Sequence, residues 1–249
     1  MITNIKIYGE RNTSTNYVEK LLEQNVDIDI LPSVVPDYVR TIQNKLSSRE
    51  LVRDIYFKFT FNRNLGWKHS CVLPEKTLKK CSLVNEKLLF VTITKNPYSW
   101  LLSMYRKPYH QYYKSKPSFE EFLQKPWKTV GRDNVGVRQL ATPVELWNAK
   151  NCSYFELDNF KVIHTKSEEL LEDPEALINK VNLHLGNPLN GAKFRDVLHS
   201  TKEKSKDRTF YQDYYLNEKW KSKLKRKHIN LINLHLDKSL MGQFGYDIL

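Results

Sequence analysis

The stretch IKIYGERNTSTNYVEKLL, residues 5–22, is the part of the sequence that decides the expected fold. Its first residues alternate as in a β-strand, and Gly9 ends the alternation. A run of small, polar or charged residues follows, and the apolar side chains of residues 17–22 then recur at helical spacing. A strand, a polar turn and the start of a helix place free backbone N–H groups where an anion can bind. We therefore predict that the turn at residues 9–16 holds a phosphate group.

Two later stretches repeat the order of strand, turn and helix. Residues 88–94, LLFVTIT, form the most hydrophobic strand pattern of the chain, which ends at Lys95 and precedes a helix that starts at Pro97. A short strand at 160–163 is also followed by a helix. Alternating strands and helices predict a parallel sheet with right-handed crossovers, whose ligands collect at the carboxyl ends of the strands. We expect a three-layer, P-loop-like α/β fold with a central mostly parallel sheet flanked by helices, and both turns at one edge.

Weaker patterns cover the rest of the chain. They predict a loop or short strand at 27–36, a surface helix at 39–51, a strand at 55–61 where IYFKFTF alternates, a helix at 74–80, and a helix that Asp173 and Pro174 start and Gly186 ends.

Two segments have an unusual composition. Residues 107–147 are aromatic and basic, and they form either an insertion that faces the substrate or ordinary helices over the sheet. Residues 201–228 carry ten Lys or Arg against four Asp or Glu, and they form either a solvated helix face or a phosphate-binding flap. We expect a single domain over residues 1–249, with the first segment as its acceptor-facing insertion and the second as a basic C-terminal segment.

The composition favours a folded protein with an anionic partner. The 249 residues include 40 Lys and Arg against 28 Asp and Glu, a net charge of +12. Three scattered cysteines suggest neither a zinc site nor a disulfide framework, so no metal is expected. No signal peptide and no apolar run of about 18 residues is visible, which predicts a soluble, cytoplasmic protein without a membrane span.

The turn at 9–16 differs from the Walker A loop of ATP-using enzymes. That loop requires G-x-x-x-x-G-K-[ST], and this chain has Ser14, Thr15 and Asn16 in the last three places. It therefore lacks the lysine that reaches the β- and γ-phosphates and the hydroxyl that binds Mg²⁺. Its N–H groups, its hydroxyls at residues 13–15 and the guanidinium of Arg11 suit a terminal phosphate or sulfate ester that needs no metal.

A second phosphate site is expected at the end of the 88–94 strand. Lys95 follows this strand directly, and Ser103 lies two turns along the next helix. A cation and a hydroxyl in these positions can hold a separate phosphate through charge-assisted hydrogen bonds. Two phosphate sites on one sheet edge, without a triphosphate loop, indicate a nucleotide that is phosphorylated at two positions of its ribose.

At these motifs the sequence resembles the PAPS-dependent sulfotransferases, where PAPS is 3′-phosphoadenosine 5′-phosphosulfate. GERNTSTNYVEKLL resembles the 5′-phosphosulfate loop of the prokaryotic-type branch, and KNPYSWLLSMYRKPYH resembles its 3′-phosphate segment. EELLEDPEALINKVNLHLG and the closing FGYD are similar to a later helix and the C-terminal end. The resemblance implies that the chain binds PAPS, and its product adenosine 3′,5′-bisphosphate, without a metal. The implied binding residues are Gly9, Arg11, Asn12, Thr13, Ser14, Thr15, Asn16, Lys95 and Ser103.

The resemblance also implies the catalytic groups. Asn12 stands where the family often has Lys, so Arg11, and next Lys68, are expected to take that role. Trp67-Lys68-His69 resembles a Lys-His pair of this branch, which makes His69 the candidate base; His164 is its main rival. The acceptor is a molecule with a hydroxyl group, and aromatic residues of the insertion give a preference for a carbohydrate. The candidate acceptor-binding residues are Tyr105, Arg106, Tyr109, Trp127 and Arg138.

Two other functions stay open at this stage. A P-loop enzyme of the kinase type would use ATP or GTP with Mg²⁺. A non-enzymatic protein would bind an anionic glycan or a nucleic acid through the basic segment and the aromatic insertion. No signature of a common RNA-binding module is visible, so no specific nucleic-acid partner is expected, and the sequence is silent on oligomeric state.

Overall fold

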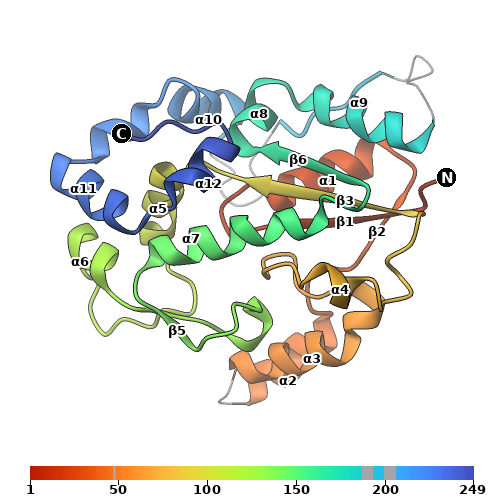
Figure 1. The fold of residues 1–249 in the computed structure, drawn as a ribbon, viewed down its shortest axis with the longest axis horizontal. Coiled ribbons are helices and arrows are strands. Elements are labelled where there is room, and N and C mark those ends of the chain that lie inside the picture. The colour runs from red at the N-terminus through yellow and green to blue at the C-terminus, as the bar shows by residue number, and fades with distance from the viewer. Residues whose placement is uncertain (47–48, 187–192, 199–205) are drawn as a thin grey trace.

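A computed structural model describes residues 1–46, 49–186, 193–198 and 206–249 (Figure 1). Its centre is a parallel sheet of four strands in the order β2-β1-β3-β6. The strands are β1 (Asn4–Gly9), β2 (Asp29–Ile30), β3 (Leu88–Thr94) and β6 (Val162–Lys166). In the register of the sheet, Gly9 is opposite Ile93, and Ile93 is opposite Thr165, so the chain leaves all three strands at the same edge. This confirms the predicted α/β fold.

Helices and loops cover both faces of the sheet, which explains why every residue of β3 is buried. One face packs against α1 (Thr15–Asn25), α8 (Ser167–Glu172) and α9 (Pro174–Leu185). The other face packs against α4 (Glu75–Leu78) and the 3₁₀ helix η2 (Ser153–Leu157), which follows α7 (Pro143–Cys152).

A third group of helices lies beyond the carboxyl ends of the strands (Figure 1). Its buried core contains Trp100, Trp127, Trp147 and Trp220. The helices of this group are α5 (Pro97–Arg106), α6 (Phe119–Gln124), α10 (Arg208–Tyr215), η3 (Lys219–Lys223), α11 (Arg226–His235) and α12 (Lys238–Gln243). They close the sheet edge where a ligand is expected to bind.

Residues 55–61 are helical, so the predicted strand is wrong. They belong to α3 (Arg49–Asn64), which packs against α2 (Asp37–Lys45). Phe57 is buried with Trp67, whereas Phe59 is 82% exposed. The buried side chains of α3 therefore lie on the helix face that packs against the loop containing Trp67. This packing overrides the local preference of aromatic residues for strands.

The other predicted elements are shifted by a few residues. The 39–51 prediction corresponds to α2 and the start of α3, with residues 47–48 outside the described part. The strand expected at 160–163 is β6, and the helix expected at 74–80 is the single turn α4. Residues 107–147 contain α6, β4 (Trp127–Lys128), η1 (Gly131–Asp133), β5 (Gln139–Leu140) and the start of α7. Residues 206–228 of the basic segment form α10, η3 and the start of α11, and residues 201–205 lie outside the description. Within the described ranges, none of the helices has both the length and the apolar character required to cross a membrane.

Candidate active site

The loop between β1 and α1 has backbone conformations that favour glycine. Asn12 and Ser14 have φ angles of 67° and 70°, which lie in the left-handed region. A Cβ atom on Gly9 would lie 2.7 Å from Cγ2 of Thr15 and 2.8 Å from Oγ1 of Thr13. The loop therefore folds tightly over the end of β1, and a side chain at position 9 would displace Thr13 and Thr15.

The first turn of α1 offers hydrogen-bond donors that have no partner. Among the described residues, none accepts a hydrogen bond from the backbone N–H of Ser14, Thr15 or Asn16. These N–H groups lie at the positive end of the helix dipole. An anion that binds here satisfies them and gains favourable electrostatic energy.

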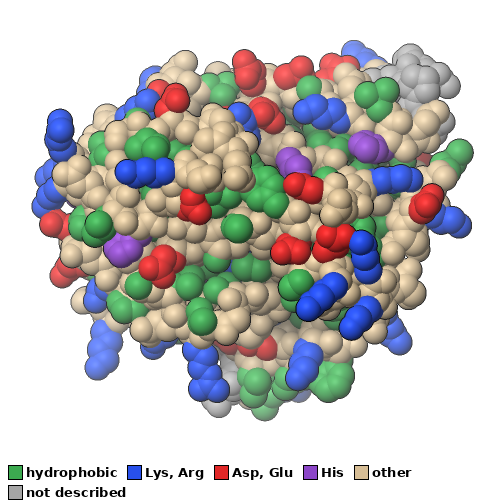
Figure 2. Space-filling view, in the orientation of Figure 1, with side chains coloured by type: hydrophobic (Ala, Val, Ile, Leu, Met, Phe, Trp, Pro, Cys, Tyr) green, Lys and Arg blue, Asp and Glu red, His purple; other side chains and the backbone are tan. Residues whose placement is uncertain are grey.

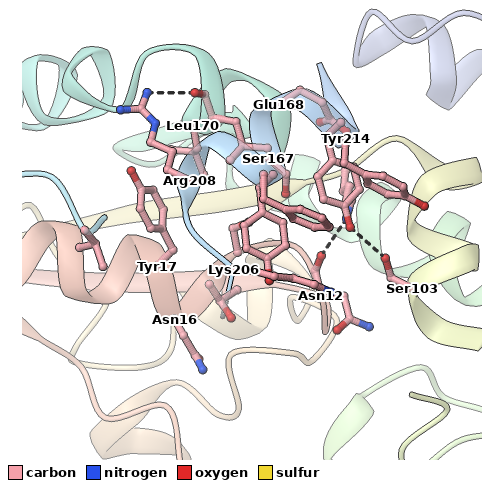
Figure 3. A pocket seen from close by; sticks show the side chains of 18 of the residues that line it. Asn12, Asn16, Tyr17, Ser103, Ser167, Glu168, Leu170, Lys206, Arg208 and Tyr214 are labelled. Atoms are coloured by element: carbon pink, nitrogen blue, oxygen red, sulfur yellow. Dashed lines mark hydrogen bonds between the residues drawn. The ribbon is translucent and has the colours of Figure 1, made fainter. Parts of the chain in front are cut away.

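A cavity of about 220 Å³, here called the first cavity, opens beside this turn (Figure 3). Of the residues predicted to bind a nucleotide, Asn12, Ser14, Thr15, Asn16, Lys95 and Ser103 line it. Arg106, expected at an acceptor, also lines this cavity, as do residues 167, 168, 170 and 171 of α8 and five residues of α10. In Figure 3, Tyr17 and Arg208 lie on one side of the cavity, and Ser103 and Tyr214 lie on the other. The structure thus brings the two predicted phosphate sites to one cavity.

The hydroxyl of Tyr215 lies within the second of these sites. It is 3.3 Å from Oγ of Ser103, which in turn accepts a hydrogen bond from Nη2 of Arg106 at 3.4 Å. Nζ of Lys95 lies 3.7 Å from the centroid of the Tyr215 ring. Burial opposes ionisation of the phenol, but Lys95, Ser103 and Arg106 together outweigh it and lower the pKa of Tyr215 to about 8. The cluster thus stabilises negative charge at this point.

Helix α10 supplies a wall of aromatic rings that the sequence analysis missed. Phe210 stacks on Tyr214 with ring centroids 6.3 Å apart, and Tyr211 stacks on Tyr215 at the same separation. All four residues line the first cavity. The sequence does contain the signal, as pairs of aromatic residues four positions apart in residues 210–215. The basic residues around these pairs led to a prediction from charge alone.

A second cavity of about 350 Å³ borders the same loop at Arg11. Its lining residues are Arg11, Gln43, Glu50, Arg53, Trp67, His69, Tyr109, His110, Tyr112 and Arg132. Tyr109 links the two cavities: it lines the second, and its hydroxyl donates a 2.9 Å hydrogen bond to Oδ1 of Asn12, which lines the first.

His69 lies in the second cavity in a defined tautomer. Its Nδ1 is 2.6 Å from the carbonyl oxygen of Gly9, which can only accept a hydrogen bond, so Nδ1 carries the proton. Among the described residues, none forms a hydrogen bond with its Nε2. Burial and the nearby charge of Arg11 lower the pKa of His69 well below its usual value, although the bond to Gly9 acts in the opposite direction. The imidazole is therefore neutral at physiological pH and has a free nitrogen that can accept a proton.

The other histidines near the sheet edge are engaged at both nitrogens. His110 accepts from Nη2 of Arg11 at 3.3 Å and donates to the carbonyl oxygen of Lys128 at 2.7 Å. His164 contacts Oγ1 of Thr92 at 2.6 Å and Oδ1 of Asp158 at 3.1 Å, and it lines neither cavity. The geometry thus favours His69 over both as a base.

Arg11 faces the second cavity instead of the first. Its guanidinium lies between the rings of Trp67 and Tyr109, at 4.5 and 4.9 Å from their centroids. It pairs with Glu10 at 3.1 Å and lies 4.0 Å from Oδ1 of Asp133. This position separates Arg11 from a phosphate at the start of α1, where the sequence analysis expected it.

A buried ionic cluster of Lys150, Asp133 and Glu10 supports the loop, and it was not predicted from the sequence. Lys150 is fully buried, and its Nζ lies 3.0 Å from Asp133 and 3.5 Å from Glu10. It also donates to the carbonyl oxygen of His69 at 2.6 Å. Burial lowers the pKa of Lys150, but the charges of Asp133 and Glu10 outweigh it and raise that pKa. The ammonium thus ties the loop to the backbone of His69.

The remaining candidates have other positions. Nζ of Lys68 donates to Asn16 at 2.8 Å and pairs with Glu19 at 2.7 Å, so it holds α1. Thr13 is buried, and its hydroxyl donates to the carbonyl oxygen of Glu10 at 2.7 Å. Among the acceptor candidates, Tyr109 lines the second cavity. Tyr105 donates to Pro117 and packs on α6, Trp127 is fully buried in the core, and Arg138 is exposed before β5.

Solved structures with a similar fold include sulfotransferases. A sulfotransferase from Alicyclobacillus acidocaldarius aligns with 99% of this chain and 97% of its own, with a TM-score of 0.50 and 14% identity. The sulfotransferase domain from the curacin biosynthetic pathway aligns with 100% of this chain and 99% of its own, with a TM-score of 0.48 and 10% identity. The fold is consistent with that of sulfotransferases. A scan against the profiles of known families and a search of curated proteins find no match.

Proposed function

We propose that this protein is a sulfotransferase that moves a sulfuryl group from PAPS to an acceptor hydroxyl. One observation supports the proposal: two groups of hydrogen-bond donors and cations that suit anions line the same cavity. The N–H groups at the start of α1 are the proposed site for one anion, and Lys95, Ser103 and Arg106 are the proposed site for the other. A nucleotide with a 5′-phosphosulfate and a 3′-phosphate requires two such sites with room for a nucleoside between them.

The residues of the first cavity fit this donor. The hydroxyl of Tyr215, whose pKa its surroundings lower to about 8, occupies a position that also suits a phosphate oxygen. The ring wall of α10 offers π-faces to an adenine base. No lysine is available at the Walker position, which Thr15 occupies, so binding relies on N–H groups, hydroxyls and surrounding cations. PAPS, when bound, supplies the sulfuryl group and the leaving bisphosphate.

Proton removal from the acceptor is assigned to His69. The Nε2 atom of this neutral imidazole is the acceptor for the proton, while Nδ1 keeps its bond to the carbonyl oxygen of Gly9. The same carbonyl belongs to the loop that binds the donor, so base and donor are held by one short segment. Lys150 fixes the backbone of His69 through a hydrogen bond to its carbonyl oxygen. Arg11 lines the same cavity as His69, so it is assigned no contact with the phosphate of the donor.

Two alternatives have less support. An ATP- or GTP-using enzyme needs the missing Walker lysine. A non-enzymatic binder of nucleic acid or glycan would benefit from one strongly basic surface, but on the face drawn in Figure 2 the Lys and Arg side chains are scattered among Asp and Glu.

Ligand-dependent thermal unfolding tests the proposal. At a concentration of 100 times its Kd, adenosine 3′,5′-bisphosphate should stabilise the protein by about 2.7 kcal/mol, and raise Tm by about 5–10 °C, with EDTA present. Mg·ATP at the same concentration should give a clearly smaller shift, because no group replaces the Walker lysine.

Lys95→Ala and Lys87→Ala provide a matched pair for this experiment. Lys95 belongs to the proposed 3′-phosphate site, whereas Lys87 is exposed before the start of β3. The bisphosphate shift should be lost in the first variant and kept in the second. Stabilisation by Mg·ATP alone, or a shift that survives in Lys95→Ala, would contradict the proposed function.

A further inference from the structure

The second cavity has a cation, Arg53, that forms no direct ion pair within the described part of the chain. Nε of Arg53 donates a 2.6 Å hydrogen bond to the neutral amide oxygen of Gln43. Among the described residues, no carboxylate lies within 4.0 Å of its guanidinium nitrogens. Burial and the charges of Arg132 and Arg40 lower the pKa of Arg53, although the charge of Glu50 acts in the opposite direction.

The two acidic side chains near Arg53 are already engaged by another arginine. Arg132 pairs with Glu50, and its Nη1 lies 2.8 Å from Oδ1 of Asp54. Asp54 also accepts the backbone N–H of Gly131 at 2.8 Å. These contacts fix both carboxylates on Arg132 and on the backbone of η1. No carboxylate among the described residues pairs directly with Arg53, so its guanidinium can pair with an anionic ligand in the cavity.

Aromatic rings and the free histidine nitrogen belong to the same cavity. Tyr109 and Tyr112 are 38% and 74% exposed, and both line it together with Arg53 and His69. Exposed tyrosine rings suit the C–H face of a sugar, and Nε2 of His69 suits its hydroxyl. A guanidinium with free donors suits an oxyanion on the same molecule.

We propose that the acceptor is an anionic carbohydrate, whose carboxylate or sulfate ester binds Arg53 while one of its hydroxyls meets His69. This inference rests on the proposed function and names its substrate class. Transfer forms a bond between the acceptor oxygen and sulfur and breaks the bond from sulfur to the bridging oxygen of the phosphosulfate. The acceptor proton passes to Nε2 of His69, and adenosine 3′,5′-bisphosphate leaves. Arg53 binds the acceptor equally before and during transfer, so it determines acceptor affinity.

Matched glycosides test this inference. The pairs are p-nitrophenyl β-glucoside with p-nitrophenyl β-glucuronide, and p-nitrophenyl N-acetylglucosaminide with its 6-sulfate. Binding is measured by calorimetry with saturating adenosine 3′,5′-bisphosphate, and transfer is measured with PAPS. The anionic member of at least one pair should bind at least tenfold more tightly than its neutral partner. Whether the glucuronide or the 6-sulfate shows the larger preference identifies the anion.

Arg53→Gln and Arg63→Gln are the matched variants, because both arginines lie on α3 and Arg63 is exposed near its end. In Arg53→Gln the KM for the anionic glycoside should rise at least tenfold with kcat nearly unchanged, and the neutral glycoside should be affected less than twofold. Arg63→Gln should behave as the unchanged protein. Thermal unfolding of each variant shows whether it is folded.

The outcomes separate this inference from the proposed function. If the bisphosphate binds but each anionic glycoside binds no better than its neutral partner, the inference is overturned and the sulfotransferase proposal stands. The inference is also overturned if the preference for anions persists in Arg53→Gln. If the bisphosphate does not bind but a glucuronide binds through Arg53, the anion site stands and the sulfotransferase proposal does not. Binding of none of these ligands contradicts both.

Discussion

Replacing Tyr215 with Phe should change how donor binding depends on pH. The Tyr215 hydroxyl lies among Lys95, Ser103 and Arg106, the groups assigned to the 3′-phosphate. Burial opposes its ionisation, but these neighbours lower its pKa to about 8. Above this pH the phenolate competes with the phosphate for the same cations. Tyr215→Phe removes the competing charge and keeps the ring that stacks on Tyr211.

The magnitude follows from the pKa. If the phosphate binds only when Tyr215 is protonated, the measured Kd increases by the factor 1 + 10^(pH − pKa). This factor is about 1.1 at pH 7 and about 11 at pH 9, so Kd should rise about tenfold, or about 1.4 kcal/mol. The second ionisation of the phosphates is about 90% complete at pH 7, because its pKa is about 6, and so contributes little to this change. In Tyr215→Phe, Kd should change less than about threefold between the same pH values.

Calorimetric titration with adenosine 3′,5′-bisphosphate measures these constants at pH 7, 8 and 9 and constant ionic strength. Two buffers with different ionisation enthalpies reveal the proton that Tyr215 takes up when the ligand binds at pH 9. Absorbance at 295 nm, which reports tyrosinate, should fall on ligand addition in the unchanged protein only. Tyr38→Phe is the control, since Tyr38 is 64% exposed on α2 and lines neither cavity.

The reasoning is refuted if Tyr215→Phe loses affinity with pH as steeply as the unchanged protein. It is also refuted if binding at pH 9 takes up no proton. Ionisation of Tyr215 weakens donor binding as the pH rises, but it stabilises the folded chain. Because the pKa of Tyr215 is lower in the folded chain than in the unfolded chain, this residue stabilises the fold above about pH 10, and that contribution is lost as the pH falls through 8.

Three further substitutions test the loop and its supports. Ser14→Gly should raise the free energy of unfolding in urea by about 0.5–1 kcal/mol, because Ser14 has a left-handed φ of 70°; an unchanged value would mean that the loop is not strained there. His69→Ala should lower kcat at least about 100-fold while the Kd of adenosine 3′,5′-bisphosphate stays within a few-fold, and near-normal turnover would exclude His69 as the base. Lys150→Met should lower the free energy of unfolding by about 3–5 kcal/mol, since it removes the closer cation of buried Asp133 and leaves Arg11 alone to balance Asp133 and Glu10; a loss below about 1 kcal/mol would show that Arg11 is enough.

Local patterns in the sequence predicted the elements that carry the first cavity. The strand, turn and helix at residues 5–22 form β1 and α1, and the apolar run at 88–94 is β3. Helix α5 starts at Pro97, and Asp173 and Pro174 start α9, as expected. Periodicity and capping involve residues within a few positions of each other, so one sequence is enough to recognise them.

The error at residues 55–61 shows the limit of such patterns. Alternation of aromatic residues suits a strand, but these residues pack as a helix against α2 and Trp67. The role of the aromatic rings of α10 was missed for the same reason, because that role depends on the cavity that they line. The groups that these residues contact are distant in the sequence, so local preference alone cannot decide between a strand and a helix or reveal a cavity lining.

By itself, the sequence determined the parallel α/β sheet and the turn at its edge that offers N–H groups to an anion. Only the tertiary structure decided which charges act there. It turned Arg11 away from the first cavity, put the Tyr215 hydroxyl beside Lys95, and left Arg53 without a described carboxylate partner. Burial and pairing between residues that are distant in sequence set the charge of such groups. That information is a property of the folded core, because it depends on distances that no local sequence pattern contains.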